Sequence, residues 1–227
     1  MPPFIISAAG LGSRLGLNLP KCLLQVHEAC LIDYQMATLP NDADVRLVVG
    51  FREDDVRCHI GSRWPNITFV RNPHYATTSN TYSINLAARM VTGPYIIIDG
   101  DLLLDTPSFE GFLKAVETAE GSLIGIAPRT TEEAVGVRIK EGMITAFLRE
   151  GDEGFEDTEF EWCGVAYIDG FTITASEGYV FEVLRSHLPL RPHHIACLEI
   201  DTPRDMSLAM QVIGQDNIRL SEPPGTS

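Results

Sequence analysis

The sequence predicts a three-layer α/β protein, in which helices cover both faces of a mixed, mainly parallel sheet. Two observations support this class. In the first half of the chain, short apolar runs alternate with segments whose apolar residues recur at helical spacing. The middle of the chain is richer in short strands, which indicates that the sheet is not purely parallel. A single core suffices, because a domain of this size buries about 70% of its unfolded surface.

Four apolar runs in the first half have the length of buried strands. They cover residues 4–8, 45–49, 67–70 and 95–98. The segments between them predict helices at residues 31–39, 52–60 and 80–91. Ligands of such sheets bind at the carboxyl ends of the strands. The residues that directly follow each apolar run are therefore the first candidates for a site.

The second half predicts one helix, a group of strands and two further helices. Thr106 is expected to be the N-cap of the first helix, with Pro107 as its first residue. The other expected elements are strands at 122–127, 135–139, 143–148, 160–168 and 195–200 and a helix near 177–187. Thr202 and Asp205 form a capping-box pattern before the last helix. No linker interrupts these elements, so we expect one domain over residues 1–220 and a flexible tail over 221–227.

Composition and charge disfavour several partners. The formal net charge is −14, from 31 acidic and 17 basic residues, and no basic cluster is present, which argues against nucleic acid and anionic membranes. No run approaches 18 apolar residues, so we expect no membrane span. The cysteines are widely spaced and form no C-x-x-C pair, which favours reduced thiols in a cytoplasmic protein over disulfides or a zinc site. They are Cys22, Cys30, Cys58, Cys163 and Cys197.

The first motif is the glycine-rich loop at residues 8–16, which follows the first strand. Its glycines let backbone N–H groups approach phosphates closely. A dinucleotide fingerprint would place its third glycine at 15, where the chain has Leu15, and a Walker P-loop would need Gly-Lys-Ser/Thr. What remains is a glycine-rich loop that contains one cation, Arg14, and is followed by a second, Lys21; these two charges suit a triphosphate. The alternative is an ordinary strand–helix turn with surface charges.

Two acidic motifs follow other apolar runs. Residues 99–101 read Asp-Gly-Asp, and residues 199–201 read Glu-Ile-Asp. Carboxylate oxygens are the ligands that Mg²⁺ prefers, so Asp101 and Asp201 could bind one ion if their strands are neighbours. The alternatives are a simple Asp-Gly turn for the first motif and, for Asp201, a favourable interaction with the helix dipole of under about 1 kcal/mol.

The motifs together resemble those of the nucleotidyltransferase superfamily of sugar-phosphate pyrophosphorylases. They lie at residues 8–14, 20–21, 99–101 and 199–202. Residues 72–75 and 79–83 further resemble the branch that contains CTP:phosphocholine cytidylyltransferases and phosphonate-activating relatives, such as 2-aminoethylphosphonate cytidylyltransferase. The resemblance covers nearly the whole chain and is weak between residues 125 and 195. It implies a Rossmann-like, GT-A-like single domain.

The resemblance also implies roles for individual residues. Arg14 would bind the β- and γ-phosphates, Lys21 the α-phosphate, and Asp101 and Asp201 the Mg²⁺ ion. Ser79 and Asn80 would lie near the base and ribose, although Asn80 is also a plausible helix N-cap. The catalytic set would be Arg14, Lys21 and Asp101. The nucleotide-binding set would be Ala8, Ala9, Gly10, Leu11, Gly12, Ser13, Arg14, Lys21, Ser79, Asn80 and Asp99.

Candidates for the acceptor site come from the residues themselves. Trp162 and Glu161 could bind an ammonium group through cation–π and Coulomb attraction worth about 1–2 kcal/mol. Arg129 or Arg149 could hold the acceptor phosphate. The alternatives are a core position for Trp162 and solvated surface charges for the others. His193 and His194 are expected in a loop, because adjacent side chains diverge and do not suit a shared metal.

These observations predict a Mg²⁺-dependent nucleotidyltransferase that uses an NTP, with CTP favoured, and a small phosphorylated or phosphonate acceptor. Many sugar-activating relatives carry Glu-Lys-Pro where this chain has Arg149-Glu150-Gly151, which weakens a sugar 1-phosphate interpretation. A D-x-D glycosyltransferase and a degenerate, non-enzymatic binding module remain as alternatives. The sequence leaves a homodimer open.

Overall fold

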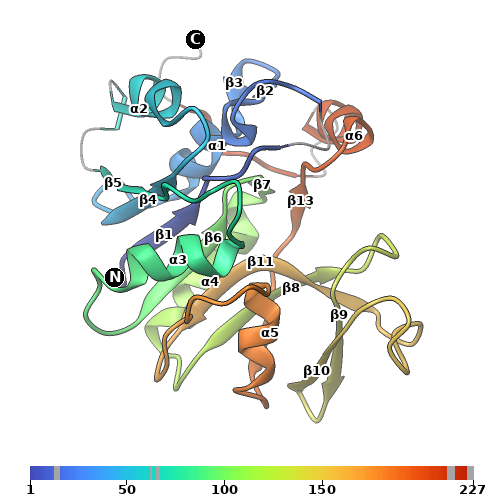
Figure 1. Ribbon diagram of the computed structural model, residues 1–227. Coiled ribbons are helices and arrows are strands. Elements are labelled where there is room, and N and C mark those ends of the chain that lie inside the picture. Colours follow the sequence, from blue (N-terminus) through green and yellow to red (C-terminus); the bar gives the residue numbers. More distant parts are fainter. Residues whose placement is uncertain (13–15, 62, 65–66, 214–217, 224–227) are drawn as a thin grey trace.

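A sheet of nine strands forms the centre of the protein (Figure 1). The computed structural model describes residues 1–12, 16–61, 63–64, 67–213 and 218–223. The strand order is β10-β9-β11-β6-β1-β4-β5, and β8 pairs with both β11 and β12. The strands are β1 (Phe4–Ser7), β4 (Val45–Val49), β5 (Ile67–Arg71), β6 (Tyr95–Asp99), β8 (Leu123–Pro128), β9 (Gly136–Lys140), β10 (Met143–Leu148), β11 (Phe160–Ile168) and β12 (Arg191–His194).

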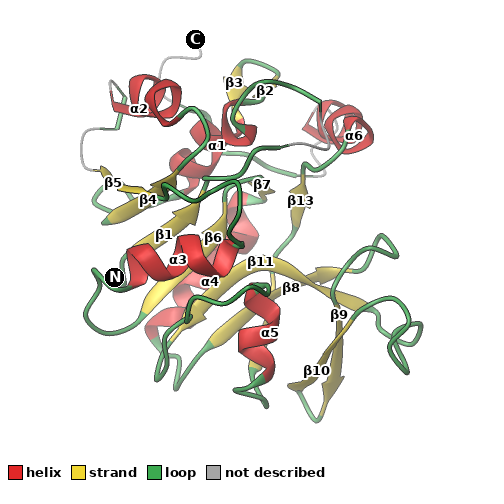
Figure 2. Ribbon diagram, viewed as in Figure 1, coloured by secondary structure: helices red, strands yellow, loops and turns green. Residues whose placement is uncertain are grey.

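Helices cover both faces of this sheet (Figure 2). The helices are η2 (Lys21–Leu23), α1 (Leu31–Thr38), α2 (Glu53–Gly61), α3 (Asn80–Ala88), α4 (Thr106–Glu117), α5 (Val180–Arg185) and α6 (Pro203–Ile213). Helices α1, α2 and α4 share one core cluster with the sheet, and α3 and α5 share the cluster on the other face. The expected three-layer, Rossmann-like arrangement is therefore confirmed.

The parallel part of the sheet contains the four strands that the first half of the sequence predicts. Strands β6, β1, β4 and β5 run parallel, whereas β11 is antiparallel to β6 and turns the sheet into a mixed one. In the register between β1 and β6, Ser7 is the partner of Asp99. The glycine-rich loop and the Asp-Gly-Asp segment therefore leave the sheet side by side.

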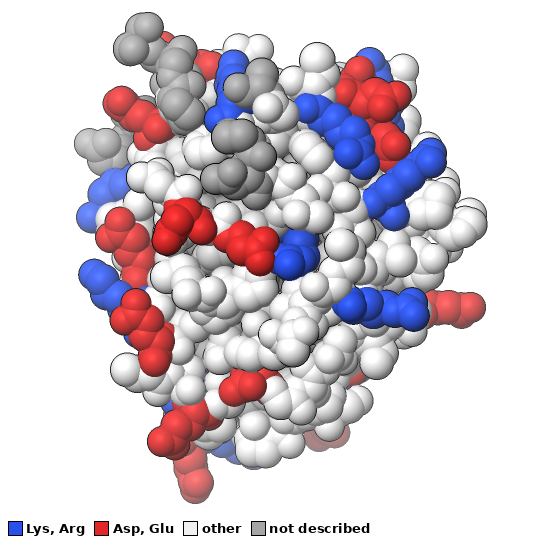
Figure 3. All heavy atoms as spheres, turned by 90° about the vertical axis from the view of Figure 1, so that its left-hand side faces the viewer, with Lys and Arg blue, Asp and Glu red and all other residues white. Residues whose placement is uncertain are grey.

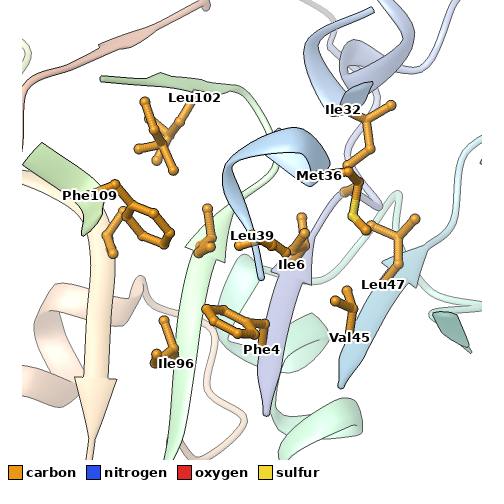
Figure 4. Packing of buried hydrophobic residues seen from close by; sticks show 14 of the residues in the cluster. Phe4, Ile6, Ile32, Met36, Leu39, Val45, Leu47, Ile96, Leu102 and Phe109 are labelled. Carbon is orange, nitrogen blue, oxygen red and sulfur yellow. The ribbon is translucent and has the colours of Figure 1, made fainter. Parts of the chain in front are cut away.

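The two faces of β1 are buried in different cores. Phe4 and Ile6 pack with α1 and α4, as Figure 4 shows for Ile32 and Phe109, whereas Ile5 packs on the α3 side. Burying an apolar side chain of this size contributes about 1.5–3 kcal/mol. An almost continuous apolar run is typical of a strand covered on both faces.

The strand that carries Glu199 lies outside the main sheet. The sequence predicts one run at 195–200, and β13 (Cys197–Glu199) lies within it, whereas β12 in the main sheet precedes this run and is not predicted. Strand β13 pairs with β7 (Leu102–Leu104), which directly follows Asp101, and not with β6. A second small sheet pairs β2 (Gln25–Val26) with β3 (Ala29–Cys30).

Two local predictions are corrected and one is confirmed. The N-cap of α4 is Asp105 and not Thr106, because the Asp105 carboxylate accepts the Ser108 N–H at 3.0 Å. His193 and His194 lie in β12 and not in a loop. The capping box of α6 is present, since Thr202 N–H donates to the Asp205 carboxylate at 2.7 Å and Asp205 N–H donates to the Thr202 hydroxyl at 3.3 Å.

The described C-terminal residues pack against the start of α4. The hydroxyls of Ser221 and Thr106 lie 3.0 Å apart, and Pro223 is buried. Within the described part of the chain, no helix is long and apolar enough to cross a membrane. On the face drawn in Figure 3, the described acidic and basic side chains are separated by large uncharged areas, so this face offers no continuous basic surface.

Candidate functional site

The site begins where β1 and β6 end, at the Asp99–Asp101 turn. Gly100 N–H donates to the Ser7 carbonyl at 3.0 Å. A Cβ atom on Gly100 would lie 2.6 Å from that carbonyl oxygen and 2.9 Å from Ala8 Cα. Only glycine lets the turn approach β1 this closely, and this close approach fixes the direction in which the two flanking aspartates leave the sheet.

Lys21 joins two carboxylates that are distant in the sequence. Its Nζ lies 2.5 Å from Asp101 Oδ2 and also contacts Asp201 Oδ1. Asp201 reaches this point because Ile200 N–H donates to the Asp101 carbonyl at 3.0 Å. Burial would lower the pKa of Lys21, but attraction and hydrogen bonds from the two carboxylates outweigh it and raise that pKa. Lys21 is therefore a fixed positive charge.

A third carboxylate, that of Glu199, completes the cluster. Ligand atoms of Asp101, Glu199 and Asp201 all lie within 4.8 Å of one another. Glu199 reaches solvent at the edge of the site, yet desolvation of its carboxylate, together with repulsion from Asp101 and Asp201, raises its pKa to about 9. The sequence motif contained Glu199 but gave it no ligand role. Its signal was the i, i+2 spacing to Asp201, which places two side chains on one side of an extended segment.

The acidic cluster fits a hard divalent cation. Asp101 Oδ1 is buried and has no hydrogen-bond partner among the described residues, so one ligand atom is desolvated and unused. Three carboxylates at one point repel one another, and Lys21 is the cation that contacts them among the described residues. Oxygen ligands of this kind bind Mg²⁺, an ion that retains several waters in protein sites.

Asp99 and Asn80 form the next layer of the site. Burial and the neighbouring Asp101 raise the pKa of Asp99 to about 7, although Lys21 and a hydrogen bond from Asn80 oppose the rise. The N-cap of α3 is Ser79 and not Asn80, so Asn80 is the first helical residue and is free to contact Asp99. Asn80 Oδ1 is buried without a described hydrogen-bond partner. Gly164 leaves space for the Asp99 carboxylate, because a Cβ atom added at residue 164 would lie 2.9 Å from Asp99 Oδ2.

Ser79 holds the start of α3 to a distant loop. Its hydroxyl donates to the Ser176 carbonyl at 2.7 Å, and the Thr81 hydroxyl lies 3.0 Å from the same oxygen. Asn85 donates to the Ile173 carbonyl at 2.9 Å. The loop before α5 is therefore fastened along one side of α3, next to Asn80 and Asp99.

The glycine-rich loop lies against Lys21. Ala8 and Ala9 are buried and bonded to the neighbouring strand segment, through Ala8 N–H to the Val48 carbonyl at 2.9 Å and Phe51 N–H to the Ala9 carbonyl at 3.1 Å. Gly12 has a positive φ of 59°, and its Cβ would lie 3.4 Å from Lys21 Cβ. Gly10 and Leu11 are exposed. Ser13 and Arg14 lie outside the described residues.

Two of the acceptor candidates, Arg129 and Glu161, interact electrostatically and also bind backbone groups. Arg129 donates to the Thr158 carbonyl at 3.0 Å and stacks over Phe155 at 4.5 Å, which fixes a loop. Glu161 accepts the Thr130 N–H at 3.2 Å, and burial raises its pKa against the opposing effects of that bond and of Arg129.

The other two acceptor candidates lie on the α3–α5 side of the sheet. Arg149 lies over Tyr179 and Phe181 at the start of α5, at 5.6 and 5.7 Å from the ring centres. Trp162 is partly buried against the core that contains α3 and α5. The structure therefore gives both residues packing contacts on that side.

Comparisons with known proteins agree with this geometry. A profile of the MobA-like NTP transferase domain matches residues 4–150. The choline-phosphate cytidylyltransferase of Streptococcus pneumoniae is 34% identical over 98 residues, which cover 41% of this chain and 42% of the relative. The CMP-5'-(3-aminopropyl)phosphonate synthase of Streptomyces rubellomurinus is 30% identical over 122 residues, which cover 51% and 19%. The chain spans less than half the length of these curated relatives.

The likeness extends to solved structures. The CTP:phosphocholine cytidylyltransferase of Streptococcus pneumoniae superimposes with a TM-score of 0.75 at 20% identity, over 93% of this chain and 98% of that one. The fold and the converging lysine and carboxylates define a nucleotidyltransferase domain. The family match covers more than half of the chain, and the chain belongs to the MobA-like NTP transferase domain family.

Proposed function

We propose that the protein is a Mg²⁺-dependent cytidylyltransferase that transfers CMP from CTP to a small phosphate or phosphonate acceptor, such as phosphocholine or 2-aminoethylphosphonate. The observation that carries the proposal is the convergence of Lys21, Asp101 and Asp201 beside the glycine-rich loop. The names of the two relatives support cytosine as the base and an amino-bearing acceptor.

In the proposed reaction, an oxygen of the acceptor attacks the α-phosphorus of CTP, in line with the bond to the β-phosphate. The new P–O bond forms as the α–β bridging P–O bond breaks, and the bridging oxygen leaves with pyrophosphate. The attacking oxygen is already anionic near neutral pH, because the second pKa of a phosphate ester is about 6. No general base is needed, so catalysis rests on positioning and on charge.

Lys21 is proposed to contact the α-phosphate. An ammonium group has three N–H donors, and Asp101 and Asp201 together accept two of them. The third can donate to a phosphate oxygen, and the raised pKa of Lys21 keeps its charge in place. When bound, Mg²⁺ would neutralise phosphate charge. Asp101 and Asp201 would hold it, with Glu199 as a third oxygen ligand.

The remaining nucleotide contacts are proposed around the same site. The backbone of residues 8–13 would hold the phosphates, and Arg14 the β- and γ-phosphates. Asn80 would offer its unpartnered amide oxygen to the ribose or base, with Ser79 and Asp99 beside it. Arg129, Arg149, Glu161 and Trp162 stay candidates for the acceptor. We also propose a cytoplasmic location, where the five free cysteines would stay reduced.

A matrix of substrates tests the proposal. Each of the four NTPs is incubated with Mg²⁺ and with phosphocholine, 2-aminoethylphosphonate, glycerol phosphate or a sugar 1-phosphate, and released pyrophosphate is measured. We expect the highest kcat/KM for CTP with one of the first two acceptors. Turnover only with a sugar 1-phosphate would show that the proposed acceptor is wrong. Sugar transfer without pyrophosphate release would contradict the whole proposal and indicate a glycosyltransferase.

A further inference from the structure

A second group of metal-ligand side chains lies between α1 and α2. Its members are Cys30, Asp33 and His59, and one ligand atom from each lies within 4.8 Å of the others. Cys30 is the N-cap of α1, Asp33 is in the first turn of that helix, and His59 is in the last turn of α2. The proposed nucleotidyl transfer uses none of them.

The carboxylate of Asp33 is held in a fixed orientation. The Asp33 side chain is 1% exposed. Its Oδ2 accepts the Cys30 backbone N–H at 3.0 Å and lies 3.2 Å from Arg63 Nη1. His59 Nε2 lies 2.9 Å from both carboxylate oxygens. Among the described residues, Oδ2 thus contacts His59, Cys30 and Arg63, whereas Oδ1 contacts the His59 imidazole.

Cys30 is the N-cap of α1, so its side chain lies at the positive end of that helix. The N-terminus of a helix favours a thiolate. As the protein stands, burial and the Asp33 charge raise the pKa of Cys30 to about 11, so the thiol is neutral. A bound cation would reverse that balance, because metal binding displaces the thiol proton.

We propose that Cys30, Asp33 and His59 form a binding site for a Zn²⁺-type transition-metal ion, with water as the fourth ligand. Thiolate, imidazole and carboxylate are zinc ligands, whereas Mg²⁺ takes oxygen ligands. Tetrahedral bonds of about 2.0–2.3 Å place neighbouring ligand atoms about 3–4 Å apart. Here His59 Nε2 lies 2.9 Å from the Asp33 carboxylate oxygens, and all three ligand atoms lie within 4.8 Å of one another. Arg63 and the Cys30 N–H would hold the other carboxylate oxygen as outer partners. The ion would clamp α2 to α1.

Spectroscopy of the Co²⁺-substituted protein tests the site. Metal-free full-length protein is titrated with Co²⁺ in an excess of Mg²⁺, and the near-ultraviolet thiolate-to-cobalt charge-transfer band is recorded. We expect the band to saturate at one equivalent and to disappear when Zn²⁺ is added. The carboxylate cluster at Asp101 gives no such band, because it contains no sulfur.

Variants separate the ligands from their neighbours. Cys30→Ser removes the band, and His59→Gln weakens Co²⁺ binding about 10-fold or more. Cys58→Ser, which changes an exposed thiol next to His59, leaves both unchanged. Circular dichroism verifies that each variant folds. If Cys30→Ser does not fold, the test rests on His59→Gln alone. Absence of the band in the native protein, or its persistence in Cys30→Ser, shows that the group is only an ion pair between helices.

Discussion

At the scale of single residues, Lys21 partly neutralises the negative charge of the candidate site. Three carboxylates and Asp99 surround one point, and Lys21 contacts two of them directly. Burial penalises a charged carboxylate and the neighbouring carboxylates repel it, which is the physical reason for the raised pKa values of Asp99 and Glu199. The same lysine that contacts Asp101 and Asp201 is the proposed contact of the α-phosphate.

Replacing this lysine tests its role in the reaction. We expect Lys21→Met to lower kcat about 10²–10³-fold, the usual effect of deleting one donor that stabilises transition-state charge. The measurement is pyrophosphate release at saturating CTP and acceptor. Lys140→Ala, which removes an exposed lysine, is the matched control and should keep full activity. A Lys21→Met protein with normal kcat would contradict the assignment.

Gly100 makes a second prediction at this scale. Gly100→Ala brings a methyl group to 2.6 Å from the Ser7 carbonyl, so β1 and the turn must separate. We expect a loss of about 1–3 kcal/mol in the free energy of unfolding, together with a large fall in kcat as Asp99 and Asp101 shift. Denaturant unfolding and pyrophosphate release measure the two effects. Gly61→Ala, where a Cβ meets nothing within 4 Å, should change neither.

At the scale of elements, Asp105 joins α4 to the C-terminal segment. It caps the helix through Ser108 N–H and accepts Arg219 N–H at 3.0 Å and Arg219 Nε at 3.2 Å. Burial would raise its pKa, but these bonds outweigh burial and lower the pKa below its ordinary value of 3.8. The Arg219 side chain is 63% exposed, so we attribute most of the stabilisation to the backbone donors.

The sign of this shift fixes a pH dependence. A lowered pKa stabilises the folded protein fully above about pH 5, and the contribution is lost as pH falls through the folded pKa. Asp105→Asn keeps a capping oxygen but removes the charge, so we expect it to cost about 1 kcal/mol at pH 7. In urea unfolding, the gap to the native protein should close below about pH 4. If the difference in unfolding free energy between the two proteins stays constant with pH, the charge of Asp105 does not contribute to stability. Asp42→Asn, at an exposed loop position, is the control.

At the scale of the whole molecule, the candidate site forms where four segments meet. The ends of β1 and β6, the η2 turn and the segment after β13 each supply part of it. The pairing of β7 with β13 is decisive, because it brings residues 197–199 back beside residues 102–104. Ligand binding should therefore stabilise the fold as a unit.

A thermal shift measures this coupling. At CTP and Mg²⁺ concentrations about 100 times Kd, binding adds about 2.7 kcal/mol of stability. For a chain of this length, that corresponds to a rise in Tm of about 5–10 °C. Asp101→Asn should abolish the rise, whereas Glu117→Gln on the exposed side of α4 should keep it. If EDTA leaves the CTP-induced shift unchanged, the Mg²⁺ part of the proposal is wrong.

The sequence by itself determined the layers, most strands and the family motifs. Apolar periodicity is a local property of the sequence. The motif residues around Lys21, Asp99–Asp101 and Glu199–Asp201 can likewise be recognised from the sequence alone. Two helix starts were not predicted correctly: the caps are Asp105 and Ser79 instead of Thr106 and Asn80. The Asp105 carboxylate accepts the Ser108 N–H, whereas the Ser79 hydroxyl donates to the Ser176 carbonyl, a long-range contact that local pattern does not show.

Only the tertiary structure decided which of these residues share a site. The place of β13 beside β7, and with it the ligand role open to Glu199, depends on pairing between segments almost a hundred residues apart. The same holds for the Cys30, Asp33 and His59 group, whose cysteine looked isolated in the sequence. Side-chain periodicity tells which face of an element is buried, but it carries no information about which distant element will cover that face.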